Sequence, residues 1–413
     1  MEMTPEQSNR LGLPEFVALI AVMTAIVAFS IDSMLPAMPE IARELSPDDP
    51  NKAQLIITSF VFGMGLGTLF AGPLADAFGR KPVIIFGTGI YIIGAVLAYV
   101  SQSLELALAA RVLQGLGAAG PRIASMAIIR DLYEGRQMAR IISLVMMVFA
   151  LIPAMGPLMG QGIIYLVGWR GIFLAFILFG ILSCTWLGRR QPETLATDNR
   201  RPFRLSTIIA GTKEICRIRR VMLVIGSLSF TFALLFTMIS TTQQVFDQTF
   251  GQAEAFPYWF FIIAVFSATG SIINARIVVR VGMRRLVAIG LGAEFILSLL
   301  FMALILTGTL DGASYYYGYI LWLFSIFFVA GITIGNLNAL GMEPLGHLAG
   351  LGASVISSIA TIAAVVIAIP IGLAFDGTPL PLAIGIAICA LLGMVLVMMV
   401  EDLPDSSTTT PAG

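Results

Sequence analysis

The feature that most constrains this chain is an apolar stretch of about twenty residues that recurs along its length. There are twelve such stretches, each bounded by charged or turn-forming residues. They cover roughly residues 14–36, 53–72, 82–101, 104–128, 139–163, 168–188, 221–243, 257–279, 285–308, 315–338, 351–374 and 379–400. Such lengths suit helices that cross a bilayer, whereas barrel strands would alternate over about ten residues. Of the 413 residues, 58% are hydrophobic and 12% charged, which excludes an ordinary soluble enzyme. We predict an all-α membrane protein with twelve transmembrane helices.

One long polar break, residues 188–220, divides these stretches into six plus six. It predicts two pseudo-symmetric six-helix halves joined by a flexible cytoplasmic connector. The last residues are rich in Ser, Thr and Pro and are expected to be disordered. The predicted division is an N-terminal half, a connector, a C-terminal half and a tail, namely residues 1–188, 189–220, 221–400 and 401–413.

Charge is distributed unevenly over the turns. With the N-terminus inside, nineteen of the 24 Lys and Arg residues lie on the inner side. The positive-inside rule then predicts that both termini are cytoplasmic. The formal net charge is zero, which argues against a nucleic-acid partner. Three cysteines and one histidine show no metal-ligand spacing, so we expect no metal and no cofactor.

The turn between the second and third predicted helices carries a dense motif. Its glycines allow a tight turn, and its acid and two cations lie where a cytoplasmic gate has to close. The residues are Gly72, Asp76, Gly79, Arg80 and Lys81. The G-x-x-x-D-x-x-G-R-K pattern resembles the signature of the major facilitator superfamily, and the alternative is a simple positive-inside turn. The resemblance implies that Asp76 pairs with cations such as Arg130, near the start of the eleventh helix, and latches the cytoplasmic side.

A second motif lies in the fourth predicted helix. Arg111, Gln114, Gly115 and Ala118 share one helical face. They resemble the R-x-x-Q-G-x-G-A-A motif of the drug:proton antiporter branch. Arg111 lies about 10 Å inside the outer end of its helix, seven residues at 1.5 Å each. An ionisable residue at that depth is a functional candidate facing a cavity, although its side chain could also snorkel outward.

Asp32, near the outer end of the first helix, lies at a depth similar to that of Arg111. A carboxyl group in a low dielectric tends to keep its proton, whereas a neighbouring guanidinium favours the ionised form. We therefore predict a switchable pair in which a proton or a cationic drug competes with Arg111 for Asp32. The alternative is a static ion pair that holds the first and fourth helices together.

The fifth predicted helix contains Pro153, Gly156, Pro157 and Gly160. This run is similar to the G-P-x-x-G-G core of an antiporter motif, with Gln161 in place of the second glycine. Small residues allow close packing, and prolines let a helix bend. Together with the D-x-x-L-P-A-x-P run at residues 32–39 and the R-D-L-Y run at residues 130–133, it resembles the bicyclomycin and chloramphenicol-type (Bcr/CflA) exporters.

Weaker candidates remain within the spans. Four residues could line a cavity, namely Arg122, Met146, Thr241 and Asn336. The alternative is snorkelling for Arg122, packing for Met146, and hydrogen bonding between helices for Thr241 and Asn336. Glu294 lies near the middle of the ninth helix, where proton transfer and a structural or oligomer contact are equally consistent with its position.

These features and resemblances predict a proton-coupled secondary transporter in a bacterial cytoplasmic (inner) membrane. It would export small amphipathic or hydrophobic compounds by alternating access. Asp32 would accept the proton or cation, Arg111 would modulate it, and Asp76 with Arg130 would form the inner gate. Its partners would be the substrate, protons and membrane lipid, and we expect a monomer. One alternative is transport of a single native metabolite, such as an amino acid or organic acid. A membrane receptor or enzyme has less support because no catalytic set lies in the spans.

Overall fold

The computed structural model describes residues 11–401, so Arg10 and the predicted tail beyond Glu401 lie outside the described residues. Twelve described helices are long and apolar enough to cross a membrane, and this part of the chain contains no strand. Both findings confirm the predicted fold class. The first six spanning helices are α1 (Leu13–Asp32), α3 (Leu55–Phe78), α4 (Arg80–Tyr99), α5 (Leu104–Leu132), α6 (Gly135–Val167) and α7 (Gly171–Arg190). The second six are α9 (Arg219–Gln244), α10 (Phe256–Val281), α11 (Met283–Leu306), α12 (Gly312–Met342), α13 (Ala349–Leu373) and α14 (Leu380–Met398).

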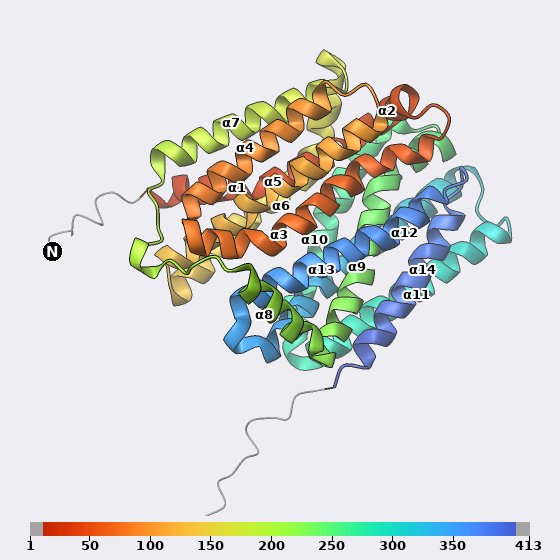
Figure 1. The fold of residues 1–413 in the computed structure, drawn as a ribbon. Coiled ribbons are helices and arrows are strands. Elements are labelled where there is room, and N and C mark those ends of the chain that lie inside the picture. Colours follow the sequence, from red (N-terminus) through yellow and green to blue (C-terminus); the bar gives the residue numbers. More distant parts are fainter. Residues whose placement is uncertain (1–10, 402–413) are drawn as a thin grey trace, which may run out of the picture.

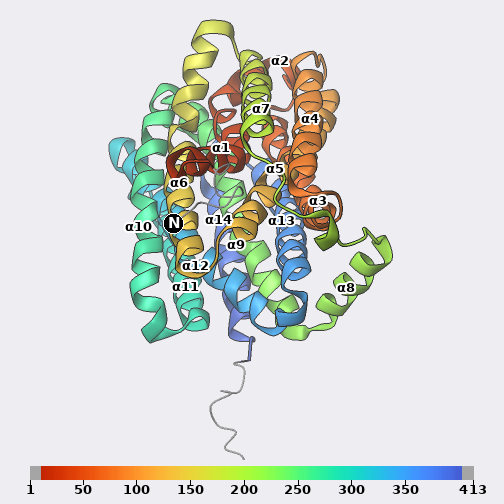
Figure 2. The same cartoon turned by 90° about the vertical axis from the view of Figure 1, so that its left-hand side faces the viewer.

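Short elements connect or extend these helices. They are η1 (Leu35–Ala37), α2 (Met38–Leu45), η2 (Pro50–Gln54), η3 (Thr197–Asn199), α8 (Leu205–Arg217), η4 (Val245–Thr249), η5 (Ala253–Ala255) and η6 (Glu343–Leu348). The bundle has two ends that differ in the short elements they carry. The linker end carries α8, at the lower left of Figure 1, and the far end carries α2, at the upper right. Figure 2 shows α4 and α7 in the upper part of the view and α10 and α11 at its left and lower left.

The two sets of six helices meet along two helix pairs. Helix α3 packs against α13, and α6 packs against α10. Within the first set, α3 and α5 approach closely because glycines remove side chains from their contact. A Cβ added at Gly63 would lie 2.0 Å from the Val112 carbonyl oxygen, and one added at Gly115 would lie 1.9 Å from that of Phe60. Gly115 of the fourth-helix motif is therefore a packing residue.

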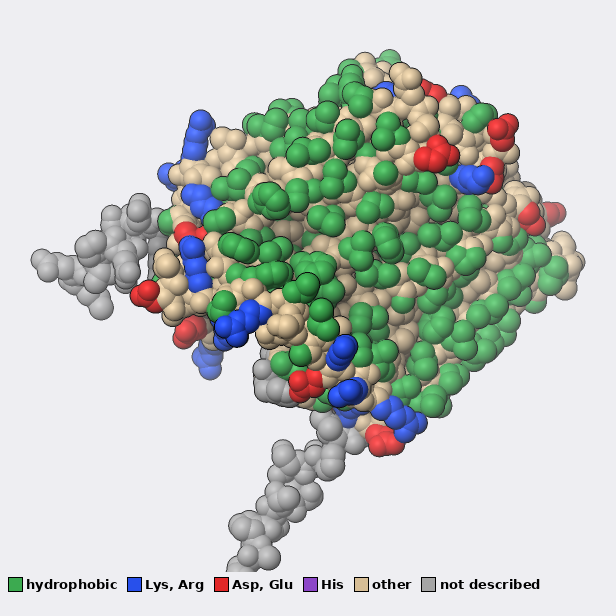
Figure 3. Space-filling model, in the orientation of Figure 1, with side chains coloured by type: hydrophobic (Ala, Val, Ile, Leu, Met, Phe, Trp, Pro, Cys, Tyr) green, Lys and Arg blue, Asp and Glu red, His purple; other side chains and the backbone are tan. Residues whose placement is uncertain are grey.

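The surface is consistent with a bilayer as solvent. Large apolar side chains such as Phe86, Val279 and Leu300 are exposed. Figure 3 shows apolar side chains over the middle of the visible face, with charged side chains gathered toward its two ends. Such a belt excludes water from the middle of the bundle and leaves the ends to contact headgroups and solvent.

The connector differs from the flexible segment that was expected. Residues 205–217 form α8, which packs on α13 and α9. Ile208, Gly211 and Ile215 face this contact and are buried, and a Cβ at Gly211 would come within 2.4 Å of Leu351. The sequence does not single out α8, because the cations around this short amphipathic helix dominate the composition of the break. The exact division of the chain into halves, connector and tail stays a prediction.

Candidate functional site

Helix α1 breaks at Asp32. The helix ends there, and the chain then passes through a turn into η1 and α2. Pro36 and Pro39 follow the break, and neither has a backbone N–H with which to continue a helical ladder. Asp32 is only 4% exposed. The D-x-x-L-P-A-x-P run therefore places a buried carboxyl group at the end of a broken membrane helix.

Helix α6 holds this break in place. A Cβ added at Gly156 would lie 2.5 Å from the Asp32 Cβ, and one added at Gly160 would lie 2.0 Å from the Ser33 carbonyl oxygen. Pro153 and Pro157 lie inside the same helix. The sequence predicted close packing by this run, and the structure adds that the packing partner is the Asp32 break.

Arg111 is fully buried where α1, α3 and α5 meet. Its Nε donates to the Ile56 carbonyl oxygen (3.1 Å), Nη1 to Gln114 Oε1 (2.7 Å), and Nη2 to the Ser30 carbonyl oxygen (2.9 Å). The guanidinium carbon also lies 4.5 Å from the centre of the Phe60 ring. The charge is therefore balanced by neutral oxygens and an aromatic face.

The predicted ion pair between Asp32 and Arg111 is wrong for this conformation. All three guanidinium nitrogens donate to other oxygens, and no ion pair among residues 11–401 joins the two side chains. Arg111 instead holds the backbone carbonyl two residues before Asp32. Sequence depth alone could not distinguish these cases, because a broken helix offers free carbonyl groups as well as a side chain.

At the linker end, the motif residues form a chain of ion pairs. Arg80 pairs with Asp76, and its Nε lies 3.0 Å from Asp131 Oδ2. Arg130 is exposed and belongs to none of the ion pairs found in the described part of the chain. The predicted Asp76–Arg130 pair is therefore corrected, because the α5 residue that turns toward the motif is the acid that follows Arg130.

The connector completes this network. Gly79 has a φ of 106°, which favours glycine, and it directly precedes α4. Glu193 caps that helix by accepting from the backbone N–H groups of Arg80 and Lys81, both at 3.0 Å. Lys81 Nζ donates to the Gly188 carbonyl oxygen (2.7 Å). Sequence reasoning missed Glu193 because no local pattern links an acid in the connector to a turn more than a hundred residues earlier.

The expected proximity of this turn to the eleventh spanning helix is seen one helical turn before Asp76. A Cβ added at Gly72 would lie 3.1 Å from Ser354 Oγ, in the first turns of α13. The ion pairs themselves, however, join α3, α4 and α5 of the same half.

At the far end, neutral groups join the two halves. Asn51 Nδ2 donates to the carbonyl oxygens of Leu373 (3.1 Å) and Phe375 (2.7 Å), and Gln244 Nε2 donates to Asn51 Oδ1 (2.6 Å). Sequence reasoning did not single out Asn51, because one amide in a short turn carries no pattern. We call these three hydrogen bonds the Asn51 clasp.

The weaker candidates have separate environments. Thr241 is buried and donates to the Thr237 carbonyl oxygen (2.8 Å), whereas Met146 is exposed. Asn336 donates to Asn274 Oδ1 (2.7 Å), a bond between α12 and α10 that matches the interhelical alternative. Arg122 is partly buried, and its Nη1 lies 3.6 Å from Met64 Sδ.

Glu294 is fully buried in α11. Its Oε1 accepts from Ser298 Oγ (3.1 Å), which in turn accepts from Trp322 Nε1 (3.0 Å). Its Oε2 has no hydrogen-bond partner. Within residues 11–401, no group of three or more His, Cys, Asp or Glu side chains is placed to hold a metal ion.

Comparison with known families shows to which family the motif-bearing chain is related. The family model of the Major Facilitator Superfamily matches residues 20–368. The chain belongs to the major facilitator superfamily. It is 31% identical over 353 residues to a bicyclomycin resistance protein homolog of Haemophilus influenzae, which covers 83% of this chain and 85% of that protein. It is also 32% identical over 189 residues to a chloramphenicol resistance protein of Pseudomonas aeruginosa, over 45% of each chain. These relatives confirm the resemblance to the bicyclomycin and chloramphenicol-type exporters.

Solved structures support the fold. The human organic anion transporter MFSD10 (TETRAN) matches with a TM-score of 0.66 and 16% identity, over 95% of this chain and 100% of that one. The xylose transporter XylE from E. coli, in a partially occluded inward open conformation, matches with a TM-score of 0.69 and 14% identity, over 96% and 99%. This member of the superfamily therefore has a transporter fold built from twelve spanning helices.

Proposed function

We propose that this protein is a proton-coupled exporter of small amphipathic or hydrophobic compounds. The observation that carries the proposal is Asp32, a buried carboxyl group at the break of α1 that belongs to none of the ion pairs described for residues 11–401. Such a group can take up and release a proton or a cationic cargo, since it is not already neutralised by a fixed cation. Relatives named for bicyclomycin, chloramphenicol and multidrug resistance support export of drug-like compounds.

In this mechanism Arg111 acts on Asp32 through the backbone. It holds the Ser30 carbonyl oxygen, so it fixes the last turn of α1 beside the carboxyl group. When Asp32 gains or loses a charge, the electrostatic field at this turn changes, and the glycine contacts with α6 transmit any movement to a second helix. Alternating access then consists of rocking of the two halves around their α3–α13 and α6–α10 contacts.

The setting of this mechanism is part of the same proposal. The protein would lie in a bacterial cytoplasmic membrane as a monomer surrounded by lipid, with residues 1–188 and 221–400 as halves and both termini cytoplasmic. The linker end is then the cytoplasmic end, because its turns and connector carry most of the cations. Its Asp76 network would organise the inner gate, and the Asn51 clasp would close the outer one.

A sealed-vesicle experiment tests the role of Asp32. The protein is reconstituted with an imposed pH gradient, and transport of ethidium and of chloramphenicol is measured. Asp32→Asn is expected to abolish transport driven by the gradient, because a neutral amide of similar shape cannot exchange a proton. Asp48→Asn, which changes an exposed acid at the same end, is the matched control and should transport normally. Undiminished transport by Asp32→Asn would remove Asp32 from the mechanism.

Arg122 favours transport of a single anionic metabolite as the second candidate. This cation lies inside α5 and belongs to none of the ion pairs described between residues 11 and 401. A carboxylate on a substrate could supply its counter-charge. Competition between anionic and cationic compounds, with Arg122→Gln compared against the exposed Arg130→Gln, separates the two functions. Selective loss of anion competition in Arg122→Gln would favour the metabolite.

A further inference from the structure

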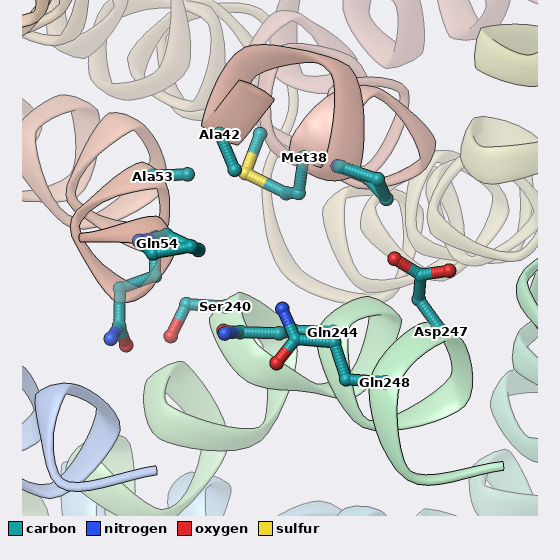
Figure 4. Close-up of a pocket in the computed structure, with 10 residues that line it drawn as sticks. Met38, Ala42, Ala53, Gln54, Ser240, Gln244, Asp247 and Gln248 are labelled. Carbon is teal, nitrogen blue, oxygen red and sulfur yellow. The ribbon is translucent and has the colours of Figure 1, made fainter. Parts of the chain in front are cut away.

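Two acids in the second half of the chain have opposite surroundings, although both belong to none of the ion pairs described for residues 11–401. Asp247 in η4 lines a small pocket at the far end (Figure 4) and is partly exposed, so water can solvate its charge. Glu294 lies near the middle of α11 and is fully buried. A buried carboxylate without a counter-cation loses its hydration without compensation. The neighbours of Glu294 therefore decide which form it takes.

The helices around Glu294 offer no cation to neutralise it. Helix α11 packs against α14, α12 and α10. Helices α12 and α14 contain no Asp, Glu, Lys, Arg or His, and their titratable side chains are tyrosines and Cys389. The cations of α10 and α11 lie near the turn at Gly282, namely Arg276, Arg280, Arg284 and Arg285. Arg285, the nearest to Glu294 along α11, precedes it by nine residues, about 14 Å of helix axis.

The hydrogen bonds beside Glu294 leave one hydrogen missing. Ser298 Oγ donates to Glu294 Oε1 (3.1 Å) and accepts from Trp322 Nε1 (3.0 Å). Ser325, the second hydroxyl beside this carboxyl group, donates to the Trp322 carbonyl oxygen (2.7 Å). A hydroxyl group has one hydrogen to donate, so neither serine can donate to Glu294 Oε2, which has no partner. A proton on Oε2 supplies the missing hydrogen and turns the neighbouring Ser325 oxygen into an acceptor.

We propose that Glu294 is a second proton-binding site of this protein and that its proton is bound in this conformation. The protonated carboxyl group joins α11 to α12 through Ser298 and Trp322, whose ring also stacks on Phe301 of α11 with 4.8 Å between the ring centres. Each half then contains one buried carboxyl group, Asp32 in the first and Glu294 in the second. Loss of the proton from Glu294 leaves an unbalanced charge between α11 and α12 and weakens their contact.

Infrared spectroscopy of the purified full-length protein at neutral pH detects the proton directly, because a protonated carboxyl group has a C=O stretch separate from the bands of a carboxylate. The background is Asp32→Asn, which removes the buried carboxyl group of the other half. We expect a carboxylic acid band that is lost with Glu294→Gln and kept with Glu254→Gln, the same change at an exposed acid. Ser298→Ala should shift the band, because the carbonyl oxygen loses its donor. Absence of a band that depends on Glu294, or a band that Ser298→Ala leaves in place, would overturn the proposal.

Thermal unfolding gives a second measurement. The unfolded chain releases a glutamic acid proton above about pH 4.3, so a folded state that keeps it loses stability as the pH rises. Between about pH 6 and pH 9, Tm should fall less in Glu294→Gln than in the unchanged protein, by a few degrees, whereas Glu254→Gln should follow the unchanged protein. Glu294→Met replaces Glu294→Gln if the amide variant fails to fold. An equal fall in all proteins contradicts the proposal. Both measurements detect the proton and not transport, so their outcome is independent of the proposed role of Asp32.

Discussion

The two ends of the bundle differ in which parts of the chain their polar networks join. At the linker end, Arg80 pairs with two acids, and all three residues belong to one half. At the far end, Asn51 and Gln244 join the two halves through neutral amides and carbonyl groups. A charged network that is partly buried is costly to break, whereas a side-chain amide whose hydrogen bond becomes exposed exchanges its partner for water at little cost. We therefore expect the far end to be the joint that opens, and the linker-end network to move as a unit with its half.

The largest effect is expected for Arg80→Ala. Its loss leaves Asp76 and Asp131 without the cation between them, and removing one partner of such a network costs about 3 kcal/mol of stability. We expect a lower Tm in detergent and loss of transport in vesicles.

Arg130→Ala is the matched control, because this cation is exposed and makes none of the ion pairs described in residues 11–401. Its Tm and transport should stay close to those of the unchanged protein. If instead Arg130→Ala were the damaging variant, the pairing inferred from family resemblance would describe the working protein better than this conformation does.

A smaller and different effect is expected for Asn51→Ala. The variant removes the three hydrogen bonds of the clasp and should favour opening of the far end by about 2 kcal/mol, since each bond contributes about 1 kcal/mol or less. Opening is measured as the rate at which a membrane-impermeant maleimide labels Cys introduced by Ala53→Cys. The native cysteines Cys184, Cys216 and Cys389 are replaced in this background.

Asn338→Ala is the control that separates loss of any side-chain amide from loss of the Asn51 clasp. Its amide donates to the Ile334 carbonyl oxygen of its own helix, so labelling at position 53 should not change. Faster labelling in Asn51→Ala alone supports the clasp. Equal labelling in Asn51→Ala, in Asn338→Ala and in the Ala53→Cys background without either change contradicts the assignment of the far end as the weaker joint.

The smallest effect is expected for Glu193→Gln. The amide keeps one accepting oxygen at the start of α4, but it loses the second acceptor and the negative charge that favours a helix N-terminus, a change of about 1 kcal/mol. Tm should fall slightly at low ionic strength, and the difference should shrink in high salt because partly exposed charges are screened. Asp198→Asn, an exposed acid in the same connector, should show no such salt-dependent difference.

Most of the fold could be predicted from the sequence, and much less of the candidate site. The apolar stretches located all twelve spanning helices, because a bilayer demands internally bonded segments of a set length. The Gly156 and Gly160 run correctly indicated close packing. The partners of charged groups were harder: Asp76 pairs with Arg80, and Arg111 binds carbonyl groups. Small rotations of a helix decide which of several nearby oxygens a long side chain reaches, and no local pattern records them.

By itself, the sequence determined the solvent, the number of crossings, the close contacts made by glycine and the identity of the family. Only the tertiary structure decided that Glu193 caps α4, that Asn51 joins the halves and that Arg111 holds the Ser30 carbonyl oxygen. The physical reason is that the two kinds of interaction act over different ranges. Burial in lipid acts on every residue of a helix and leaves a periodic pattern, whereas a hydrogen bond or ion pair acts over about 3 Å between residues that only the packed bundle brings together.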